Sequence, residues 1–341
     1  MGIEIRPLQE PEIPQAAAVC DYAFRSNPVS VVRNPRVWKW RYWEFPGFDP
    51  RGAVAAVDGE RVVGTVMVTF RRLRLDRWVR FGVIDDVATL PECRGKGVAR
   101  RMMEAALRFI ESRGAGASLL YADPKGVARN LYLDLGYRDI HLFGAWVRPL
   151  WSGLLAHRLA SGLRMKPGLR RRVIEPSDGL RLCGAGELEE YRKALEAASG
   201  HLAGFPEMEG GFWGWMRARN PTRPRTLALG WPPRAGCSLC PLPVALLAGA
   251  ETEGLWMGDF FSADGSDPLA GAVSLARRNG FAFVGALSSP LDRTRVALLR
   301  RHGFVTGFSG TMMVKPFGDI DLRPFSRRPW HPMAESGIGL P

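Results

Sequence analysis

The segment LPECRGKGVARRMMEAALRFI, residues 90–110, constrains the fold more than any other stretch of this chain. Gly95 and Gly97 stand there among four basic residues between positions 94 and 101. Glycine lets backbone N–H groups approach a ligand without interference from a Cβ atom, and the positive end of a following helix points to the same place. The segment is therefore typical of a phosphate-binding turn.

The residues around this turn indicate alternating strands and helices. An amphipathic helix over residues 98–113 is predicted because apolar side chains recur at helical spacing, at Val98, Met102, Ala106 and Phe109. FGVIDDVATL before the turn and ASLLYA after Gly114 read as strands, and VARNLYLDLGY reads as a second helix. The turn thus joins a strand to a helix, which is the context that a phosphate site needs.

Two well-known phosphate-binding motifs do not fit this turn. A P-loop requires Lys followed by Ser or Thr after the second glycine, and neither pair is present. A dinucleotide-binding fingerprint requires a third Gly or Ala where this chain has Arg100, and it opens the first unit of its fold, whereas several predicted strands precede this turn.

Length and charge limit the remaining possibilities. The 341 residues suit two domains of about 150–170 residues each. A formal net charge of +13 favours anionic ligands such as nucleotides, CoA, nucleic acid or acidic lipid, unless it only reflects a basic proteome. The basic residues are scattered and show no aromatic-basic motif of single-strand binders, so we expect no nucleic-acid partner.

The remaining composition predicts a cytoplasmic protein without a metal. The five cysteines show no regular spacing, which favours a reducing compartment, and the Cys237–Cys240 pair in CSLC lacks a second ligand pair for zinc. No run of 18 apolar residues and no signal peptide is present in this sequence, so we expect no membrane span.

These motifs together resemble the GCN5-related N-acetyltransferase (GNAT) family. RGKGVA matches the family signature [QR]-x-x-G-x-[GA], VIDDVATLPEC looks like the bulged central strand, and VARNLYLDLGY looks like the later helix. The resemblance covers residues 1–148 in the order of the family. It implies an α/β (α+β) fold with a mixed, mostly antiparallel sheet flanked by helices, and acetyl-CoA as co-substrate.

By this resemblance, backbone N–H groups of the glycine turn receive the pyrophosphate of acetyl-CoA. Thr89 and Leu90 at the strand end would offer backbone groups to the pantetheine arm. Many relatives have Asn where this chain has Lys125, and a lysine there would reach phosphate instead. The expected cofactor-binding residues are Thr89, Leu90, Arg94, Gly95, Lys96, Gly97, Val98, Ala99, Arg100 and Lys125.

Acetyl transfer to an amine needs a base, donors for the oxyanion and an acid for the departing thiolate. Tyr132 occupies the family's acid position, although its apolar helix neighbours also suit a packed tyrosine. Asp85 stands where many relatives carry Glu, and Asp85 or Asp86 would serve as the base, directly or through water, unless they are surface or ion-paired acids. Period-two alternation predicts that the two aspartates face opposite sides of the strand.

The second part of the chain resembles a degenerate copy of the first. WKWRYWEFP and WGWMRARNP share their Trp and Pro spacing, and LWMGDFF, DPLAGAVSLARRNG, FAFVGAL and RTRVALLRRHGF repeat the strand–helix order. We therefore predict a GNAT domain at residues 1–148, a linker at 149–178, a degenerate GNAT-like domain at 179–318 and an irregular tail at 319–341.

Only the first lobe is predicted to bind acetyl-CoA. The corresponding turn of the second lobe, SADGSDP, carries Asp264 and Asp267 in place of basic residues and a single glycine, Gly265, and Leu299 replaces Tyr132. Two carboxylates there would repel a pyrophosphate. The basic linker reads as an interlobe helix or as a membrane-surface helix.

The function indicated is transfer of an acetyl group to an amine of an unidentified small molecule or peptide. Alternatives are transfer of a longer acyl group, acyl-CoA decarboxylation, or a non-catalytic CoA sensor. The Trp-x-Trp segments would either line an acceptor pocket or pack in the core between lobes, and their repetition favours packing. The sequence carries no signal for the oligomeric state.

Overall fold

The computed structural model describes residues 2–24, 35–150, 181–208, 211–212, 215, 226–229, 235–246, 250–262, 267–318 and 320–331. The predicted linker therefore lies outside the described residues for all but its first two positions and the far tail lies beyond them. The part up to residue 150 is called the first half below, and the part from residue 181 to residue 331 the second half.

From β4 to α4 the first half has the strand–helix–strand–helix order that the sequence predicted. Its elements are β1 (Glu4–Pro7), α1 (Ile13–Phe24), α2 (Pro35–Arg41), β2 (Ala53–Asp58), β3 (Arg61–Arg74), β4 (Trp78–Thr89), α3 (Val98–Ser112), β5 (Ala117–Ala122), α4 (Val127–Asp134) and β6 (Arg138–Pro149).

The second half repeats the order strand, strand, helix, strand, helix, strand that runs from β3 to β6. Its elements are β7 (Arg181–Leu182), α6 (Leu188–Ala198), β8 (Phe205–Pro206), β9 (Thr226–Leu229), β10 (Ala235–Leu246), β11 (Ala250–Ser262), α8 (Pro268–Arg278), β12 (Phe283–Ser288), α9 (Arg293–Arg301) and β13 (Val305–Pro316).

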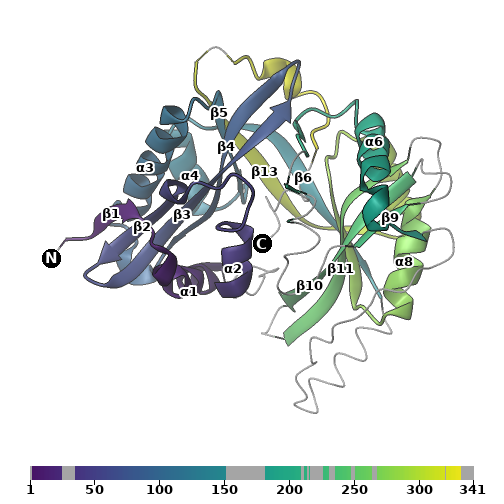
Figure 1. Cartoon of the computed structure of the whole chain (residues 1–341), viewed down its shortest axis with the longest axis horizontal. Helices are drawn as coiled ribbons and strands as arrows, with labels where there is room; N and C mark the ends of the chain where they lie inside the picture. Colours follow the sequence, from purple (N-terminus) through teal and green to yellow (C-terminus); the bar gives the residue numbers. More distant parts are fainter. Residues whose placement is uncertain are drawn as a thin grey trace.

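The strands of the described ranges form one mixed, mostly antiparallel sheet that runs through both halves. Its order is β1-β2-β3-β4-β5-β13-β6-β12-β11-β10-β9-β7, with β8 paired to β3. Only β4 with β5 and β11 with β12 are parallel. The α/β fold with a mixed sheet and flanking helices that the sequence predicted is thus confirmed, and Figure 1 shows the two halves side by side.

The two halves exchange their last strands at the centre of this sheet. β13 lies between β5 and β6, and β6 lies between β13 and β12, so each half contributes a strand to the other. The two strands have 12 residues each and pair antiparallel, with Phe143 opposite Gly310 near the middle. Neither half can therefore complete its sheet without the other.

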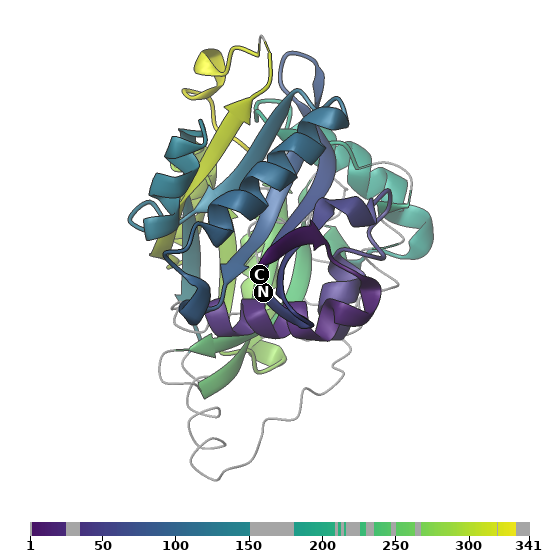
Figure 2. The same ribbon diagram turned by 90° about the vertical axis from the view of Figure 1, so that its left-hand side faces the viewer.

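α3 packs against the sheet of the first half through one apolar stripe. Met102, Ala106 and Ile110, spaced four residues apart, are fully buried, and Figure 2 shows the helix lying across the strands. Burying a side chain of the size of Met or Ile contributes about 1.5–3 kcal/mol. This packing fixes where the N-terminus of α3 lies relative to the end of β4.

Tryptophans join the halves, which confirms the packing interpretation of the Trp-x-Trp segment in the first half. Trp40 and Trp215 stack with ring centroids 4.5 Å apart, and each indole N–H donates to the backbone carbonyl of the other residue, at 3.2 and 2.9 Å. Trp38 is also buried. Trp213 lies outside the described residues.

The described part of the C-terminal tail is irregular but packed. It contains one short 3-10 turn, Arg323–Phe325, and then buries Trp330 and His331 completely. His331 Nε2 lies 2.6 Å from Oδ1 of Asp259, a buried aspartate on β11. Phe325 and Trp330 pack in a core cluster with Phe81 of β4 and Leu119 of β5, so the tail up to residue 331 is packed against the first half as well as the second.

No helix in the described ranges is long and apolar enough to cross a membrane.

Candidate functional site

The turn between β4 and α3 presents a row of unused backbone donors. After Thr89 the chain makes a short 3-10 turn, Pro91–Cys93, and α3 begins at Val98 with Gly97 as its N-cap residue. Within the part of the chain that the structure describes, the N–H groups of residues 95–100 donate to no acceptor. The first turn of any helix leaves such donors free, and here the loop before it adds more.

Glycine is required at two positions of this turn. Gly95 and Gly97 both have φ near +72°, a left-handed conformation that costs an L-residue about 1–2 kcal/mol. A Cβ atom at either position would meet nothing within 4 Å, so these glycines are not needed for internal packing. They instead shape an open turn whose N–H groups donate to no described residue.

The basic side chains of the turn differ in how far they are engaged. Lys96 is exposed, Arg94 donates from Nε to the Thr89 carbonyl at 3.1 Å, and Arg100 forms an ion pair of 2.8 Å with Asp134 at the end of α4. The last contact joins the beginning of α3 to α4. Val98 is buried and Ala99 half-buried, so these two would contribute backbone rather than side-chain contacts.

The strand end beside the turn offers fewer backbone groups than the sequence suggested. Leu90 donates to the Val63 carbonyl at 2.9 Å and accepts from Cys93 at 2.9 Å, so both its backbone groups are in use. Pairing between β4 and β5 covers only Phe81–Ala117 to Val83–Leu119. The edge of β4 from residue 84 to Thr89 is therefore open on that side, and the buried Thr89 hydroxyl has no partner among the described residues.

Asp85 and Asp86 lie at the start of this open edge and reach the same cation. Arg41 of α2 forms an ion pair with Asp85, and its guanidinium lies 4.0 Å from Oδ2 of Asp86. The expectation of opposite faces was therefore wrong. The register of β3 against β4 shifts between Thr65 and Met67, and Asp86 has a positive φ of 46°, so the bulge breaks the alternation.

The two carboxylates differ in how they are enclosed. Oδ2 of Asp86 accepts from Trp38 Nε1–H at 2.7 Å and from the Tyr42 hydroxyl at 2.8 Å, and its side chain is 1% exposed. The side chain of Asp85 is 25% exposed. Burial, the largest single effect, opposes the charge of Arg41, but Asp85 and the smaller contributions of Tyr42 and Asp86 together raise the pKa of the guanidinium.

Tyr132 lies on α4 in the core, with its ring edge against Tyr137 at 6.1 Å between centroids. Burial raises the pKa of its phenol, and the Asp85 carboxylate raises it further. The same two causes raise the pKa of Tyr121 on β5. Among the described residues the Tyr132 hydroxyl makes no hydrogen bond. The structure thus places Asp85 and Tyr132 within electrostatic reach of each other.

Lys125 lies apart from these contacts. It is exposed on the loop between β5 and α4, and only its backbone N–H is engaged, by Asp123 Oδ1 at 2.9 Å. Its ammonium makes no ion pair with any residue that the structure describes.

The sequence interpretation missed Arg41 and Tyr121. Trp38, Arg41 and Tyr42 follow the i, i+3, i+4 spacing of one helix face, and this pattern in WKWRYW was a usable signal for a polar cluster aimed at the central strand. Tyr121 carried no such signal, because ASLLYA reads as an ordinary buried strand.

The corresponding end of the second half is built differently. Asp267 is the N-cap of α8, and its carboxylate accepts from the N–H groups of Leu269 and Ala270. A carboxylate therefore occupies the helix end where a phosphate would bind. Leu299, at the position of Tyr132, is fully buried. Asp264 and Gly265 lie outside the described residues.

No cluster of three or more His, Cys, Asp or Glu that would hold a metal ion occurs in the described ranges. Cys237 is buried on β10, and the side chain of Cys240 is outside the description.

Comparison with known families matches the first half. The profile of the Acetyltransferase (GNAT) domain matches residues 4–139. The chain is similar to mycothiol acetyltransferase of Rhodococcus jostii (strain RHA1), with 27% identity over 166 residues, which is 42% of this chain and 54% of that protein. It is also similar to mycothiol acetyltransferase of Rhodococcus opacus (strain B4), with 28% identity over 36% of this chain and 44% of that protein. The chain thus matches about half the length of these relatives.

Solved structures resemble most of this chain in fold. Saccharomyces cerevisiae N-myristoyltransferase with bound myristoyl-CoA superposes with a TM-score of 0.69 at 10% identity, covering 92% of this chain and 84% of that one. A GCN5-related N-acetyltransferase from Kribbella flavida superposes with a TM-score of 0.58 at 19% identity, covering 92% and 72%. At these identities the likeness concerns the fold alone.

Proposed function

This chain belongs to the GCN5-related N-acetyltransferase superfamily through its domain at residues 4–139, and on that premise we propose that it transfers an acetyl group from acetyl-CoA to an amine. The acceptor is a small molecule or a peptide that carries the amine. The observation that supports this proposal best is the row of unpaired N–H groups at residues 95–100, between the end of β4 and the beginning of α3.

The pyrophosphate of acetyl-CoA would bind at this turn. The left-handed glycines Gly95 and Gly97 let the phosphate oxygens approach the backbone, and the N-terminus of α3 adds the positive end of its dipole. The exposed Lys96 contributes charge, and Arg94 and Arg100 contribute more if they exchange their present partners for phosphate. The acyl-pantetheine arm would then run along the open edge of β4 toward Asp85 and Tyr132.

The reaction would proceed by direct attack of the amine on the thioester carbonyl. A C–N bond forms while the C–S bond breaks, and the amine loses one proton while the leaving thiolate gains one. Tyr132 is the proposed acid, because its raised pKa keeps the phenol protonated at neutral pH and its hydroxyl has no competing partner in the described chain.

Asp85 is the proposed acceptor of the amine proton, directly or through water, because it is the more exposed of the two aspartates. Asp86 accepts hydrogen bonds from Trp38 and Tyr42 and lies close to the guanidinium of Arg41. Its proposed role is therefore to position Arg41 and the bulge. The second half, whose α8 N-terminus already holds Asp267, would complete the sheet and border the acceptor site rather than bind a second acetyl-CoA.

The test is a turnover assay with acetyl-CoA and a panel of amines, in which the free thiol that is released is measured. Gly97→Val should abolish turnover, because a side chain at this position blocks the approach of the pyrophosphate. Gly59→Val is the matched control, since Gly59 is also left-handed, with φ +61°, and also has no neighbour within 4 Å, but lies in the turn between β2 and β3. Equal turnover of the two variants would contradict the site.

Longer acyl-CoA substrates in the same assay test the acyl group. Faster turnover of a longer acyl-CoA would mean that the transferred group is that acyl group rather than acetyl. Thiol release without any amine would favour a reaction on the acyl group itself. Binding of acyl-CoA without thiol release would favour a CoA sensor.

A further inference from the structure

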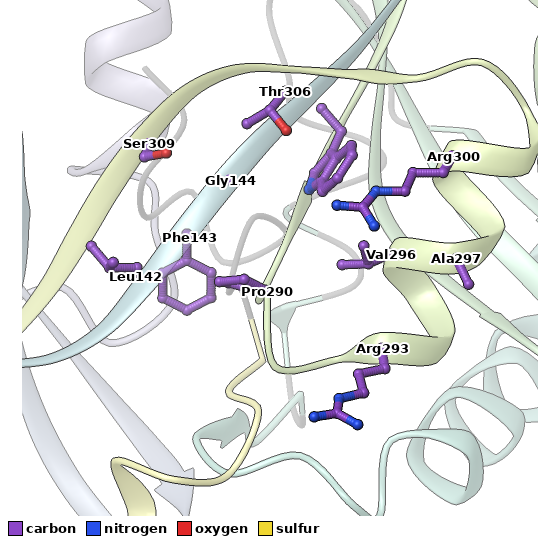
Figure 3. A pocket seen from close by; sticks show the side chains of 11 residues that line it. Leu142, Phe143, Gly144, Pro290, Arg293, Val296, Ala297, Arg300, Thr306 and Ser309 are labelled. Carbon is purple, nitrogen blue, oxygen red and sulfur yellow. The ribbon is translucent and has the colours of Figure 1, made fainter.

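A cavity lies away from this site, between β6, β13 and α9 (Figure 3). Its volume is about 540 Å³, which falls in the range of small-molecule pockets. We call it the α9 pocket. Its wall has apolar side chains from Leu142 and Val296, hydroxyls from Thr306 and Ser309, and two guanidinium groups from Arg293 and Arg300.

The charge of the α9 pocket has one sign. No acidic residue lines it, and neither Arg293 nor Arg300 makes an ion pair with any residue in the described ranges. In Figure 3 the side chain of Arg300 extends from α9 toward the strands. It also lies over the ring of Trp146, 5.8 Å from the centroid. The Arg293 side chain extends away from Arg300, at the edge of the pocket. One cation that reaches over the cavity and a second at its edge, without a counter-charge, favour an anionic occupant.

A buried donor without a partner lies at the floor of the same pocket. Trp146 is 6% exposed, and its indole N–H has no hydrogen-bond partner among the described residues. Its Nε1 lies 3.1 Å from the position that a Cβ on Gly144 would take, and Gly144 lines the pocket. A buried N–H without an acceptor is costly, and an oxygen acceptor supplied by a ligand would satisfy it.

In the other half of the molecule, side chains fill the corresponding space. α4 ends before the left-handed Gly136, and α9 ends before the left-handed Gly303. Aligned on these glycines, Thr306, Val296 and Gly144 of the α9 pocket correspond to Asp139, Arg129 and Thr311.

Those three counterparts form a closed polar network. Arg129 forms an ion pair with Asp139, and the Thr311 hydroxyl donates to Asp139 at 2.8 Å. In the α9 pocket the carboxylate, the guanidinium and the hydroxyl are replaced by Thr, Val and Gly, which leaves a hollow. The arginines there, Arg293 and Arg300, have Gly126 and Leu133 as counterparts, so the positive charge is specific to this half.

We propose that the α9 pocket binds a small anionic molecule with an apolar body. Its carboxylate or phosphate pairs with Arg300 and accepts the Trp146 indole N–H, while its body packs against Leu142 and Val296 and Arg293 adds positive charge at the edge of the pocket. This site takes the place that the Asp139 carboxylate occupies in the other half. It is separate from the glycine turn and does not depend on the acyltransferase proposal.

Three probes of one body test the proposal in the full-length protein: 1-naphthoate, 1-naphthyl phosphate and the neutral 1-naphthalenemethanol. Titration calorimetry should show one site per chain for at least one anion, with a Kd of about 1 mM or tighter, and weaker binding of the alcohol. Whichever of the two anions binds more tightly assigns the ligand to the carboxylates or to the phosphate esters. Binding should persist with saturating acetyl-CoA.

Two variants locate the site. Arg300→Gln should weaken anion binding about tenfold, whereas Arg301→Gln, on the same helix with the same loss of charge but paired with Asp267, should leave it unchanged. Trp146→Phe should weaken anion binding about threefold. The variant also identifies the indole ¹⁵N–H signal of Trp146 by its absence, and in the native protein this signal should shift when the anion is added. Equal binding of the alcohol, equal affinity of Arg300→Gln and Arg301→Gln, or displacement by acetyl-CoA would each overturn the proposal.

Discussion

Removing the charge of Arg41 should destabilise the protein far more than removing an exposed arginine does. The Arg41 side chain is 10% exposed and the two carboxylates that it serves are 25% and 1% exposed. Breaking a buried ion pair by removing one partner costs about 3–5 kcal/mol, since an uncompensated charge is left behind. In Arg41→Met, Asp86 keeps its hydrogen bonds from Trp38 and Tyr42. We therefore expect the free energy of unfolding to fall by about 3 kcal/mol, at the lower end of this range.

Urea unfolding at pH 7 measures this loss, with Arg72→Met as the matched control. Arg72 is also on the first half and is ion-paired, with Glu207, but it is 52% exposed, so its removal should cost about 0–1 kcal/mol. Adding Asp85→Asn to Arg41→Met should restore part of the stability, because one of the two unpaired charges is then gone. A loss for Arg41→Met no larger than that for Arg72→Met, or no recovery in the double variant, would refute this account of the cluster.

Two further predictions concern Tyr132 and His141. Tyr132→Phe should lower kcat by at least about tenfold and change the KM for acetyl-CoA by less than about twofold, since a proton donor acts at thiolate departure; an unchanged kcat in steady-state assays would leave Tyr132 a packing residue. Burial lowers the pKa of His141 to about 4, whereas the pKa of histidine in the unfolded chain is about 6.5. The unfolded chain therefore takes up the proton first as the pH falls, and the free energy of unfolding should decrease by about 2 kcal/mol between pH 7.5 and pH 4.5 because of this residue alone. His141→Asn should show a flatter dependence of the urea midpoint over that window, and parallel curves for the two proteins would argue against the burial of a neutral imidazole.

The sequence predicted the parts of the molecule that local patterns determine. The strand before the glycine turn, the amphipathic helix after it and the helix that carries Tyr132 are present with boundaries within a few residues, because periodicity and glycine stops are local signals. The repeated element order of the second half could be recognised for the same reason.

Strand neighbours could not be predicted in this way. The exchange of β6 and β13 depends on pairing between residues far apart in sequence, such as Phe143 and Gly310, and an alternating pattern does not say which strand lies beside it. The bulge at Asp86, which breaks the alternation of side chains along β4, could not be predicted either, because it depends on a register shift against β3. The α9 pocket arises from Gly144 and Val296, two small or apolar residues that carry no functional signal by themselves.

The central claim, that acyl-CoA binds only at the turn between β4 and α3, is tested most directly by calorimetric titration with CoA. We predict one site per chain for the native protein and for Gly59→Val, and none for Gly97→Val. Two sites per chain in the native protein, or one site retained by a folded Gly97→Val protein, would contradict the claim.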